Sequence, residues 1–315
     1  MGKKIVTLTG GSGFVGQLLQ AGLRRRGYRV RVFDQFRGAS INLLRRRYLG
    51  ASRGPLGRAA AQGIRWVQRR VSRALLGGPL LGPSMDNILD FRSRLAQRFT
   101  GSHAVIHLAG IPHPHMPGAI DADFDRINYD GSVNVFEASK SAGVAKFIFA
   151  SSGQVYGINR PTRIDQFPIL ESNYCPTLAD GQSMYGWLKL KFEEYLAGAY
   201  VPDGPQAVSL RLEFPGFRSA SAGNLYVSTS IENLVSGVVC ALENSAGFAA
   251  EAFNLVDGHV EEGIVDVQAF LRSTWPAVPN FSKGNESLLS IAKARSLLGY
   301  DPIRDGSYFP ESLVW

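Results

Sequence analysis

Residues 4–16 of this 315-residue chain read KIVTLTGGSGFVG, an apolar run with β-branched residues followed at once by a turn rich in glycine. The first six residues suit a buried parallel strand, because strands covered on both faces carry nearly continuous apolar side chains. An amphipathic stretch continues as far as Arg26. Strand, glycine turn and helix in this order form the context in which a glycine motif predicts a dinucleotide site.

The glycines of this turn have different expected tasks. Gly10 permits the tight turn, Gly13 lets the backbone approach a pyrophosphate, and Gly16 lets the helix pack closely against the strand. The N-terminus of the helix, with Phe14 and Val15 in its first turn, then faces the phosphates. We expect these five residues to bind the cofactor.

A second strand, Arg29–Phe33, is followed directly by Asp34. A carboxylate at the end of this strand can accept hydrogen bonds from the adenosine ribose and repel a 2′-phosphate. The sequence therefore favours NAD over NADP. Arg37 weakens this preference, because a guanidinium group there could bind a 2′-phosphate.

A further buried strand is expected at residues 104–108, and the small residues Ala109 and Gly110 follow it. Small residues at the end of a strand leave room for a cofactor to pass, so Leu108, Ala109 and Gly110 are added to the predicted cofactor site. His107 is expected to be a packed structural residue rather than a catalyst.

The loop Pro112-His113-Pro114-His115 could suggest a metal site. Two prolines and the lack of nearby acidic or thiol ligands favour a rigid loop on the substrate side, and no metal site is predicted. A helix over 124–142 and a strand over 146–150 continue the alternation of strands and helices. This alternation predicts an α/β fold with an open parallel sheet and helices on both faces.

Ser152 follows the strand at 146–150, and Tyr185 and Lys189 lie one helical turn apart on a predicted helix, so they share a face. A tyrosine with a pKa of about 10 is a poor base at neutral pH, but an adjacent ammonium group and an oxidised nicotinamide favour the phenolate. Tyr185 is the predicted base. Lys189 supplies charge and can hold the nicotinamide ribose, and Ser152 orients the substrate oxygen.

These residues together resemble an extended short-chain dehydrogenase/reductase of the NAD-dependent epimerase/dehydratase family, and the resemblance covers nearly the whole chain. The motifs that carry it are Thr9-Gly10-x-x-Gly13-x-x-Gly16, Asp34, His107-Leu108-Ala109-Gly110, Asn128 before Gly131 and Asn134, Ser152 before Val155-Tyr156-Gly157, Tyr185-x-x-x-Lys189, Phe253-Asn254-Leu255 and residues 292–302. The resemblance implies a doubly wound Rossmann domain over 1–212 and a smaller C-terminal substrate-binding lobe over 213–315. It also implies that Asn128 lies at the cofactor.

The departures from the family bear on the substrate. Dehydratases of this family resemble Thr-Asp-Glu where this chain has Ser152-Gly153-Gln154, so the acid and base for elimination are missing. Simple oxidation, reduction or epimerisation through a transient ketone needs only the serine, tyrosine, lysine and nicotinamide. The expected substrate-binding residues here are Ser152, Gly153, Gln154 and Tyr185.

The connection after Arg211 is short, because 17 residues separate it from Thr229, where nucleotide-sugar members usually insert a long segment. Little wall remains to enclose a nucleotide diphosphate, and the layout is similar to that of uronate dehydrogenases, which oxidise a free sugar acid. Arg218 in this connection could bind a substrate carboxylate or phosphate, or be a solvated loop residue.

Other departures suggest that the substrate pocket has diverged. Leu188 replaces the hydroxyl residue common before the lysine, Phe214 stands where many epimerases have Asn, and Asn233 replaces an expected Asp.

The net charge of +8 is concentrated in one part of the chain. Residues 37–100 contain 13 arginines, no lysine and two acids, and the rest of the chain is slightly acidic. Residues 38–83 are interpreted as an insertion, whose amphipathic pattern around Ile64 and Val67 is that of a basic interfacial helix. Anionic membrane, partner docking and a merely solvated segment all stay open. Nucleic acid ranks last, because few aromatic residues are interleaved for stacking.

The position of the third strand also stays open. Residues 63–67 read like that strand but lack the expected Asp after it. Alternatively residues 87–90, which end in Asp90, fill the role of this strand and its acid, and residues 38–83 are an insertion. Asn87 is then the expected cofactor contact.

The main hypothesis is an NAD-dependent oxidoreductase or epimerase that acts on a secondary alcohol of a sugar or sugar-acid-like substrate. The alternatives are a membrane-associated lipid or sterol dehydrogenase and a scaffold or sensor that binds NAD without turnover. Cys175 and Cys240 are far apart, and no apolar run approaches the ~20 residues that span a bilayer. We therefore expect a cytoplasmic protein, and the family resemblance implies a homodimer.

Overall fold

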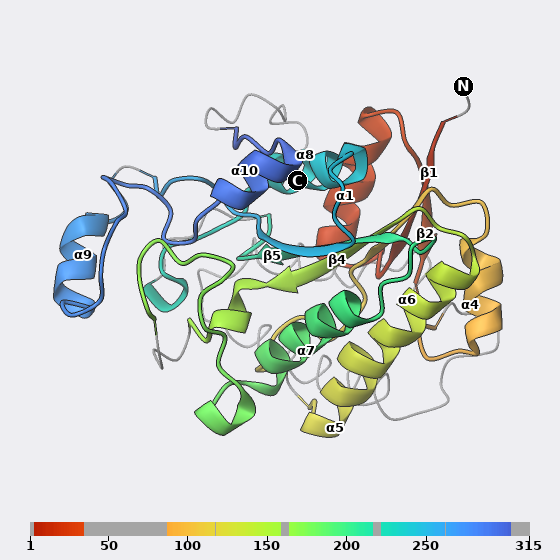
Figure 1. Cartoon of the computed structure of the whole chain (residues 1–315), viewed down its shortest axis with the longest axis horizontal. Helices are drawn as coiled ribbons and strands as arrows, with labels where there is room; N and C mark the ends of the chain where they lie inside the picture. The colour runs from red at the N-terminus through yellow and green to blue at the C-terminus, as the bar shows by residue number, and fades with distance from the viewer. Residues whose placement is uncertain are drawn as a thin grey trace, which may run out of the picture.

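A parallel sheet forms the centre of the computed structural model, which describes residues 3–34, 87–116, 118–158, 164–216, 222–261 and 263–303. The described strands lie in the order β2-β1-β3-β4-β5-β6, and every neighbouring pair is parallel (Figure 1). Their bounds are β1 Ile5–Thr9, β2 Arg29–Phe33, β3 Ala104–His107, β4 Lys146–Ser152, β5 Gln206–Leu212 and β6 Ala250–Asn254. The predicted α/β fold with a doubly wound parallel sheet is confirmed.

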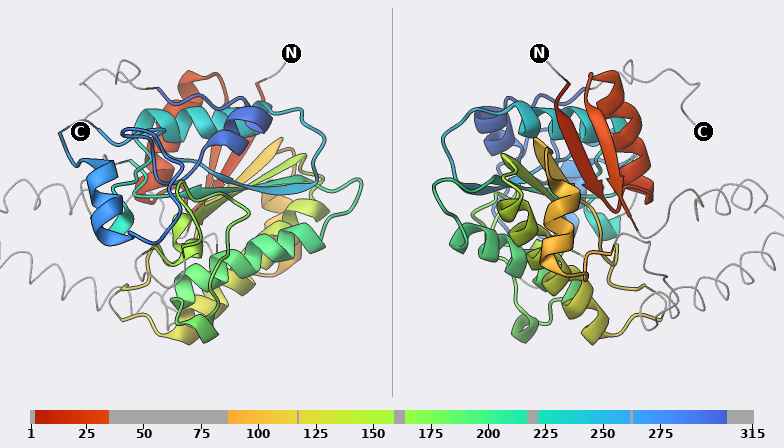
Figure 2. Two further views of the ribbon diagram at one scale, coloured as in Figure 1. Left: turned by 60° about the vertical axis from the view of Figure 1, so that its left-hand side comes forward. Right: turned by 90° about the vertical axis from the view of Figure 1, so that its right-hand side faces the viewer.

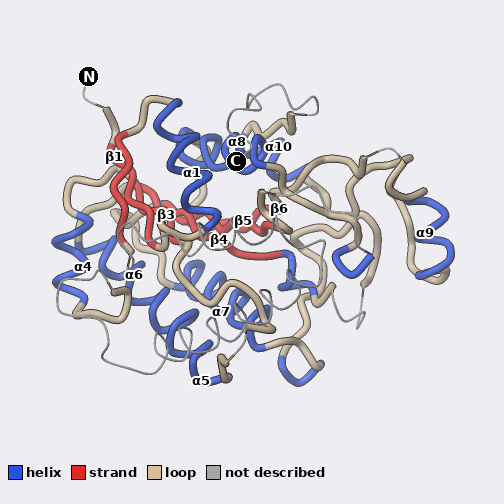
Figure 3. The backbone as a smooth tube through the Cα atoms, turned by 180° about the vertical axis from the view of Figure 1, so that it is seen from behind, coloured by secondary structure: helices blue, strands red, loops and turns tan. Residues whose placement is uncertain are grey.

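Helices cover both faces of the sheet, as Figures 1 and 3 show from opposite sides. One face carries α1 (Phe14–Arg25), α8 (Ile231–Glu243) and α10 (Ala292–Leu298). The other carries α4 (Arg92–Phe99), α6 (Gly131–Ser141) and α7 (Met184–Gly198). The right-hand view of Figure 2 looks along the sheet from the β2 edge, with α1 on one side and α4 and α6 on the other.

The apolar residues of β4 are consecutive because both faces of this strand are covered. Phe147 and Phe149 point into the core on the α6 and α7 side, whereas Ile148 packs in the core on the α1 and α8 side. Successive side chains of a strand point to opposite faces, so a strand covered on both faces needs apolar residues at every position. Burying each large apolar side chain stabilises the fold by about 1.5–3 kcal/mol.

From β1 the chain builds the sheet in two opposite directions: β2 is added on one side of β1, and β3 and the later strands on the other. Thr9, the last residue of β1, is in register with Phe33 of β2 and His107 of β3. The segments that follow β1 and β3 therefore leave the sheet at a topological switch point, where open α/β sheets bind their ligands. The glycine turn at Gly10 lies at this point.

The sheet takes elements from both sides of Leu212, where we expected the first domain to end. Strand β6 pairs with β5, and α8 packs against α1 through the contact of Gly22 with Val235. The smaller lobe also draws on both parts of the chain. Residues 167 and 169 form bridges to residues 280 and 289, and α9 (Val267–Thr274) lies at its far end (Figures 1 and 2). The sheet and the smaller lobe thus each contain residues from both sides of Leu212.

The helix expected over 124–142 consists of three consecutive segments. These are α5 (Asp121–Phe124), a π-helical segment (Asp125–Asp130) and α6. π-Helical turns are rare and are often found at functional sites. This one contains Asn128, one of the expected cofactor residues.

Several predicted features lie outside the described residues. They are the arginine-rich segment 38–83, the third-strand candidate 63–67, Arg37 and Arg218. Within the described ranges no helix is long and apolar enough to cross a membrane, and both cysteines are free.

Candidate active site

The glycine turn after β1 is packed against the end of β3. Gly10 has a φ of +69°, and a Cβ atom there would lie 2.7 Å from the backbone nitrogen of Ala109. A Cβ atom at Gly16 would lie 2.4 Å from the carbonyl oxygen of Gly11. Gly10 thus permits both a left-handed turn and a close backbone approach, and Gly16 allows α1 to start directly on the turn.

The N-terminus of α1 suits an anionic ligand. Gly13 is its N-cap and supplies no side-chain cap, and the first turn, with Phe14 and Val15, has no acidic side chain. The basic residues of α1 are in its last turn, at Arg24 and Arg25. Because the start of a helix carries partial positive charge and exposes N–H groups, phosphate groups are favoured there.

Asp34 lies beside this turn at the end of β2. Its Oδ2 accepts a hydrogen bond from the backbone N–H of Ser12, at 2.8 Å. The carboxylate is therefore held at the glycine turn, on the side where the adenosine end of a dinucleotide lies in this fold.

The end of β3 contributes the backbone of Leu108, Ala109 and Gly110. The buried side chain of Asn128 binds the next residue twice: Oδ1 accepts from Ile111 N at 2.7 Å, and Nδ2 donates to Ile111 O at 3.1 Å. The Asn128 side chain thus holds the loop after β3 in place, and contact of Asn128 with the cofactor stays a prediction.

Residues 87–90 form a turn held against α6. Asn87 Oδ1 accepts a hydrogen bond from Leu89 N at 3.0 Å. Asn134 Nδ2 donates to the carbonyl oxygens of Ile88 and Asp90, each at 2.8 Å. A Cβ atom at Gly131 would lie 2.7 Å from Ile88 Cδ1, so the turn packs on the first residue of α6.

His107 is fully buried at the end of β3. Its Nδ1 hydrogen-bonds with the Thr9 hydroxyl at 2.7 Å and its Nε2 with the Ser132 hydroxyl at 2.8 Å. Burial, and then the charge of Lys189, lower the pKa of His107 to about 3. The imidazole is therefore neutral at physiological pH and links β1, β3 and α6, in agreement with the structural role expected for it.

Strand β4 and helix α7 bring Ser152, Tyr185 and Lys189 together. Ser152 is the last residue of β4 and leads into a 3-10 helical turn, Gly153–Tyr156. Helix α7 starts against that turn, because a Cβ atom at Gly186 would lie 2.5 Å from Gln154 O. Burial raises the pKa of Tyr185, while a hydrogen bond from Ser152 opposes the rise.

Lys189 lies one turn along the same helix. Its Nζ donates to the carbonyl oxygen of Ala150 at 2.6 Å and lies 5.6 Å from the centre of the Tyr185 ring and 4.4 Å from that of Phe149. Burial lowers the pKa of Lys189 to about 8, with a smaller opposing effect of Glu193. The ammonium form is thus retained at neutral pH beside the tyrosine.

Glu213, which the sequence analysis did not select, completes this part of the site. It follows β5 directly and is 3% exposed. Its Oε1 accepts from the Ser152 hydroxyl at 3.4 Å and from Gln154 Nε2 at 3.3 Å. Burial raises the pKa of Glu213 to about 8, against the effect of the hydrogen bonds from Gln154 and Ser152. The available sequence signal was an acid placed directly after a buried strand, at the sheet edge that also carries Ser152.

Gly153 and Gln154, both expected to bind substrate, lie against the carboxyl group of Glu213. A Cβ atom at Gly153 would lie 2.8 Å from both Cγ and Oε1 of Glu213. The backbone carbonyl of Gln154 accepts a hydrogen bond from Gln182 Nε2 at 2.8 Å. Phe214, the next residue after Glu213, is 48% exposed. Its φ of +39° is unusual for a residue other than glycine.

A buried polar network connects α7 to the sheet on the C-terminal side of Lys189. Arg211 Nη2 lies 2.6 Å from Glu193 Oε2, and Arg211 Nη1 donates to the Tyr156 hydroxyl at 2.6 Å. Tyr156 in turn donates to Asn254 Oδ1 at 2.8 Å, and Glu193 accepts from the Ser151 hydroxyl. The network joins β4, β5, β6 and α7.

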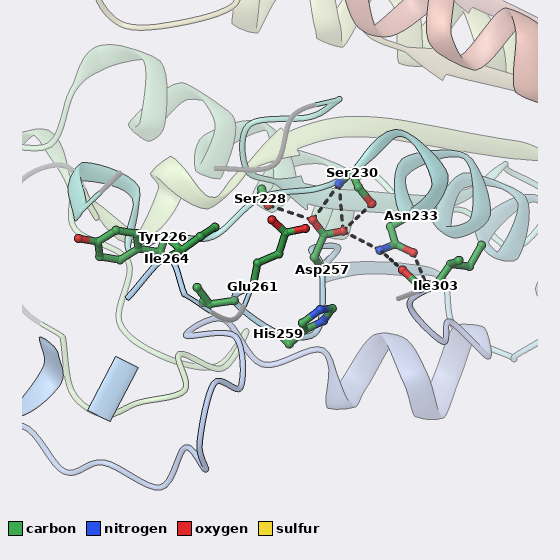
Figure 4. A pocket seen from close by; sticks show the side chains of 10 residues that line it. Tyr226, Ser228, Ser230, Asn233, Asp257, His259, Glu261, Ile264 and Ile303 are labelled. Atoms are coloured by element: carbon green, nitrogen blue, oxygen red, sulfur yellow. Dashed lines mark hydrogen bonds between the residues drawn. The ribbon is translucent and has the colours of Figure 1, made fainter. Parts of the chain in front are cut away.

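A second polar cluster surrounds Asp257 and lines a small pocket (Figure 4). The Asp257 carboxylate accepts hydrogen bonds from the Ser228 hydroxyl, from the backbone N–H and hydroxyl of Ser230, and from Asn233 Nδ2. Asn233 also exchanges two hydrogen bonds with the backbone of Ile303. An amide at position 233 can donate to the carboxylate and bind both backbone groups, which an ionised Asp could not do.

No group of metal-binding side chains is found among the residues for which the structure gives positions. The site around the glycine turn is formed by backbone groups and the carboxyl group of Asp34. The site around Ser152 is formed by hydroxyl groups, Lys189 and the carboxyl group of Glu213. Both lie at the carboxyl edge of one sheet.

The chain is similar to curated proteins of known activity and to solved structures. UDP-glucose 4-epimerase of Bacillus subtilis is 26% identical over 223 residues, which are 70% of this chain and 55% of that enzyme. The L-arabinose 1-dehydrogenase (NAD(P)(+)) of Haloferax volcanii is 28% identical over 228 residues, 70% of this chain and 82% of that enzyme. A UDP-glucose 4-epimerase structure from Stenotrophomonas maltophila matches with a TM-score of 0.63 at 20% identity, covering 96% of this chain and 94% of that one.

The matched part thus spans little more than half of the Bacillus epimerase, and the structural match at this identity shows the fold. The family model for the NAD dependent epimerase/dehydratase family matches residues 6–215, well over half of the chain. The chain therefore belongs to the NAD dependent epimerase/dehydratase family.

Proposed function

We propose that this protein is an NAD-dependent oxidoreductase or epimerase that acts on a secondary alcohol of a sugar or sugar-acid-like substrate. The observation that carries the proposal is the meeting of Ser152, Tyr185 and Lys189 at the carboxyl edge of the sheet whose switch point holds the glycine turn. A base, a charged neighbour and an orienting hydroxyl beside a dinucleotide site are the groups that this reaction needs.

The residues present fit NAD. A side chain at Gly10 would meet the backbone of Ala109, and one at Gly16 would meet the backbone of Gly11, so the turn must lack them there. The first turn of α1 suits a pyrophosphate. Asp34 is placed to accept from the adenosine ribose hydroxyls and to disfavour a 2′-phosphate. When bound, NAD supplies the hydride acceptor or donor for the reaction.

Tyr185 is the proposed base of the alcohol oxidation. Its side chain is buried, so the hydroxyl is shielded from bulk water, and Ser152 at the end of β4 opposes the rise of its pKa. The phenolate form takes the proton of the substrate hydroxyl, and the ammonium of Lys189 favours that form. Ser152 donates a hydrogen bond to the substrate oxygen as its charge develops.

The proposed substrate class is a free sugar or sugar acid. The L-arabinose 1-dehydrogenase relative acts by name on a free sugar, whereas the UDP-glucose 4-epimerase relative acts by name on a nucleotide sugar. The connection of 17 residues between Arg211 and Thr229 favours the free sugar, because it offers little wall to enclose a nucleotide diphosphate. The described side chains around Ser152 are those of Gln154, Glu213 and Phe214, which offer hydrogen bonds and one apolar face.

The test is a screen of aldoses, uronic acids and nucleotide sugars with the full chain and NAD. Oxidation is followed by NADH formation, and epimerisation, which regenerates NAD, by chromatography of the sugar products. Tyr185→Phe should lose at least about 100-fold in kcat/KM, in the range for removal of a general base, while it binds NAD unchanged. Tyr195→Phe is the matched control, because Tyr195 lies on the same helix and its hydroxyl bonds Glu137 instead. Full turnover by Tyr185→Phe would contradict the proposed mechanism. NAD binding without turnover of any substrate would favour the scaffold alternative.

A further inference from the structure

Glu213 is a buried acid for which the proposed chemistry has no assigned use. Among the described residues its carboxyl group forms no ion pair, and its hydrogen bonds come only from the neutral side chains of Ser152 and Gln154. Two described cations on neighbouring elements have other partners: Lys189 of α7 donates to Ala150 O, and Arg211 of β5 binds Glu193. Because an unpaired buried carboxylate is costly, this environment favours the neutral acid.

The hydroxyl of Ser152 contacts Glu213 and also acts on Tyr185, whose pKa it lowers. Its oxygen accepts from Gln154 N at 3.2 Å, and its single proton can be donated to Glu213 Oε1, at 3.4 Å, or to Tyr185. A serine hydroxyl has one proton, so the two acceptors compete for it. An ionised carboxylate is a much stronger acceptor than a neutral carboxyl oxygen.

We propose that Glu213 is a positioning residue that acts through Ser152: as a neutral acid it leaves the serine proton to Tyr185 and the substrate, and as a carboxylate it takes that proton and opposes the tyrosinate. This inference rests on the proposed function, because it concerns the state in which Tyr185 works as a base. Gly153 is part of the arrangement, since only the absence of a side chain there lets the carboxyl group lie against the backbone at this point.

Among the described residues, Tyr185 is the titratable group whose pKa is affected by Glu213. The negative charge of Glu213 raises the pKa of Tyr185. The side chains that form hydrogen bonds with Glu213 are those of Ser152, Gln154 and Thr229, and all three are neutral. Glu213, with a pKa of about 8, ionises before the tyrosine as pH rises. Two acids joined through one serine cannot both ionise easily, so loss of the first proton delays loss of the second.

The first experiment compares the pH dependence of kcat/KM for alcohol oxidation in the wild type and Glu213→Gln. The glutamine has nearly the same shape and stays neutral at every pH. The expected result is an active variant whose rising limb, which reports formation of the tyrosinate, moves to lower pH by on the order of one unit. An unchanged limb, a shift to higher pH, or a folded variant that binds NAD without turnover would each overturn the proposal.

The second experiment needs no substrate. Infrared difference spectra between the wild type and Glu213→Gln should show the carbonyl stretch of a protonated carboxylic acid at neutral pH, and this band should fade as pH rises through about 8. Subtraction of the variant removes the contribution of Glu171, whose pKa burial also raises. Absence of the band at neutral pH would overturn the proposal. Its presence in a protein that turns over no substrate would show that the proposed function, and not the state of Glu213, had failed.

Discussion

The guanidinium group of Arg211 lies 2.6 Å from the carboxylate of Glu193, and both side chains are almost completely buried. Arg211 belongs to β5 and Glu193 to α7, one helical turn after Lys189. The ion pair therefore connects the strand that precedes Glu213 to the helix that carries Tyr185 and Lys189, the proposed base and its charged neighbour.

We expect Glu193→Gln to destabilise the protein by about 3–5 kcal/mol, because removing one partner leaves a buried charge without compensation. Urea unfolding at neutral pH measures this change. The control is Arg295→Ala, since the pair of Arg295 with Asp301 is exposed and such pairs contribute about 0–1 kcal/mol. Equal effects of the two substitutions would contradict the assigned role of the buried pair.

Gly16→Ala should weaken both folding and NAD binding. The added Cβ atom would lie 2.4 Å from the carbonyl oxygen of Gly11, so α1 or the glycine turn must move. We expect a loss of about 1–3 kcal/mol in stability, as for overpacking, and at least about a tenfold increase in the Kd for NAD, measured by calorimetry.

Gly198→Ala is the matched control for this substitution. Gly198 ends α7, and a Cβ atom there meets nothing within 4 Å. We expect it to leave NAD binding unchanged and to stabilise the protein by up to about 1 kcal/mol. If Gly198→Ala were as harmful as Gly16→Ala, the close packing of the turn would not be the cause.

Stability should fall on acidification because of His107. Its pKa is about 3 in the folded protein, below the 6.5 of an unfolded histidine, so the unfolded chain binds the extra proton first. The contribution is complete above about pH 6.5 and is lost as pH falls toward 3, by up to about 1.4 kcal/mol per unit. Urea unfolding of His107→Gln at several pH values should show a correspondingly shallower decline. An identical slope in the variant would mean that another group causes the loss.

Asp34→Ser should change the choice between cofactors. The variant lacks the negative charge that opposes a 2′-phosphate, so we expect the ratio of NADP to NAD affinity to rise by about tenfold or more. Calorimetric titration with each dinucleotide gives the ratio directly. A ratio that stays constant would show that Asp34 does not set the preference.

Most of the fold could be predicted from the sequence because its signals are local. The apolar runs of β1, β3, β4 and β5 and the glycine turn each depend on neighbouring residues. The spacing of Tyr185 and Lys189 likewise places them on one face of a helix whatever surrounds it. The sequence by itself thus determined the parallel α/β fold, the glycine turn and three of the residues around the proposed reaction.

Only the tertiary structure decided which distant residues meet. Glu213 is 61 residues from Ser152, Arg211 is 18 residues from Glu193, and β6 joins the sheet from beyond the expected domain boundary. No local pattern marks an acid as buried or an arginine as paired, because burial depends on what packs over the side chain. The carboxyl group beside Ser152 is therefore a property of the parallel packing of β4 and β5, which brings the ends of two separate segments to one edge.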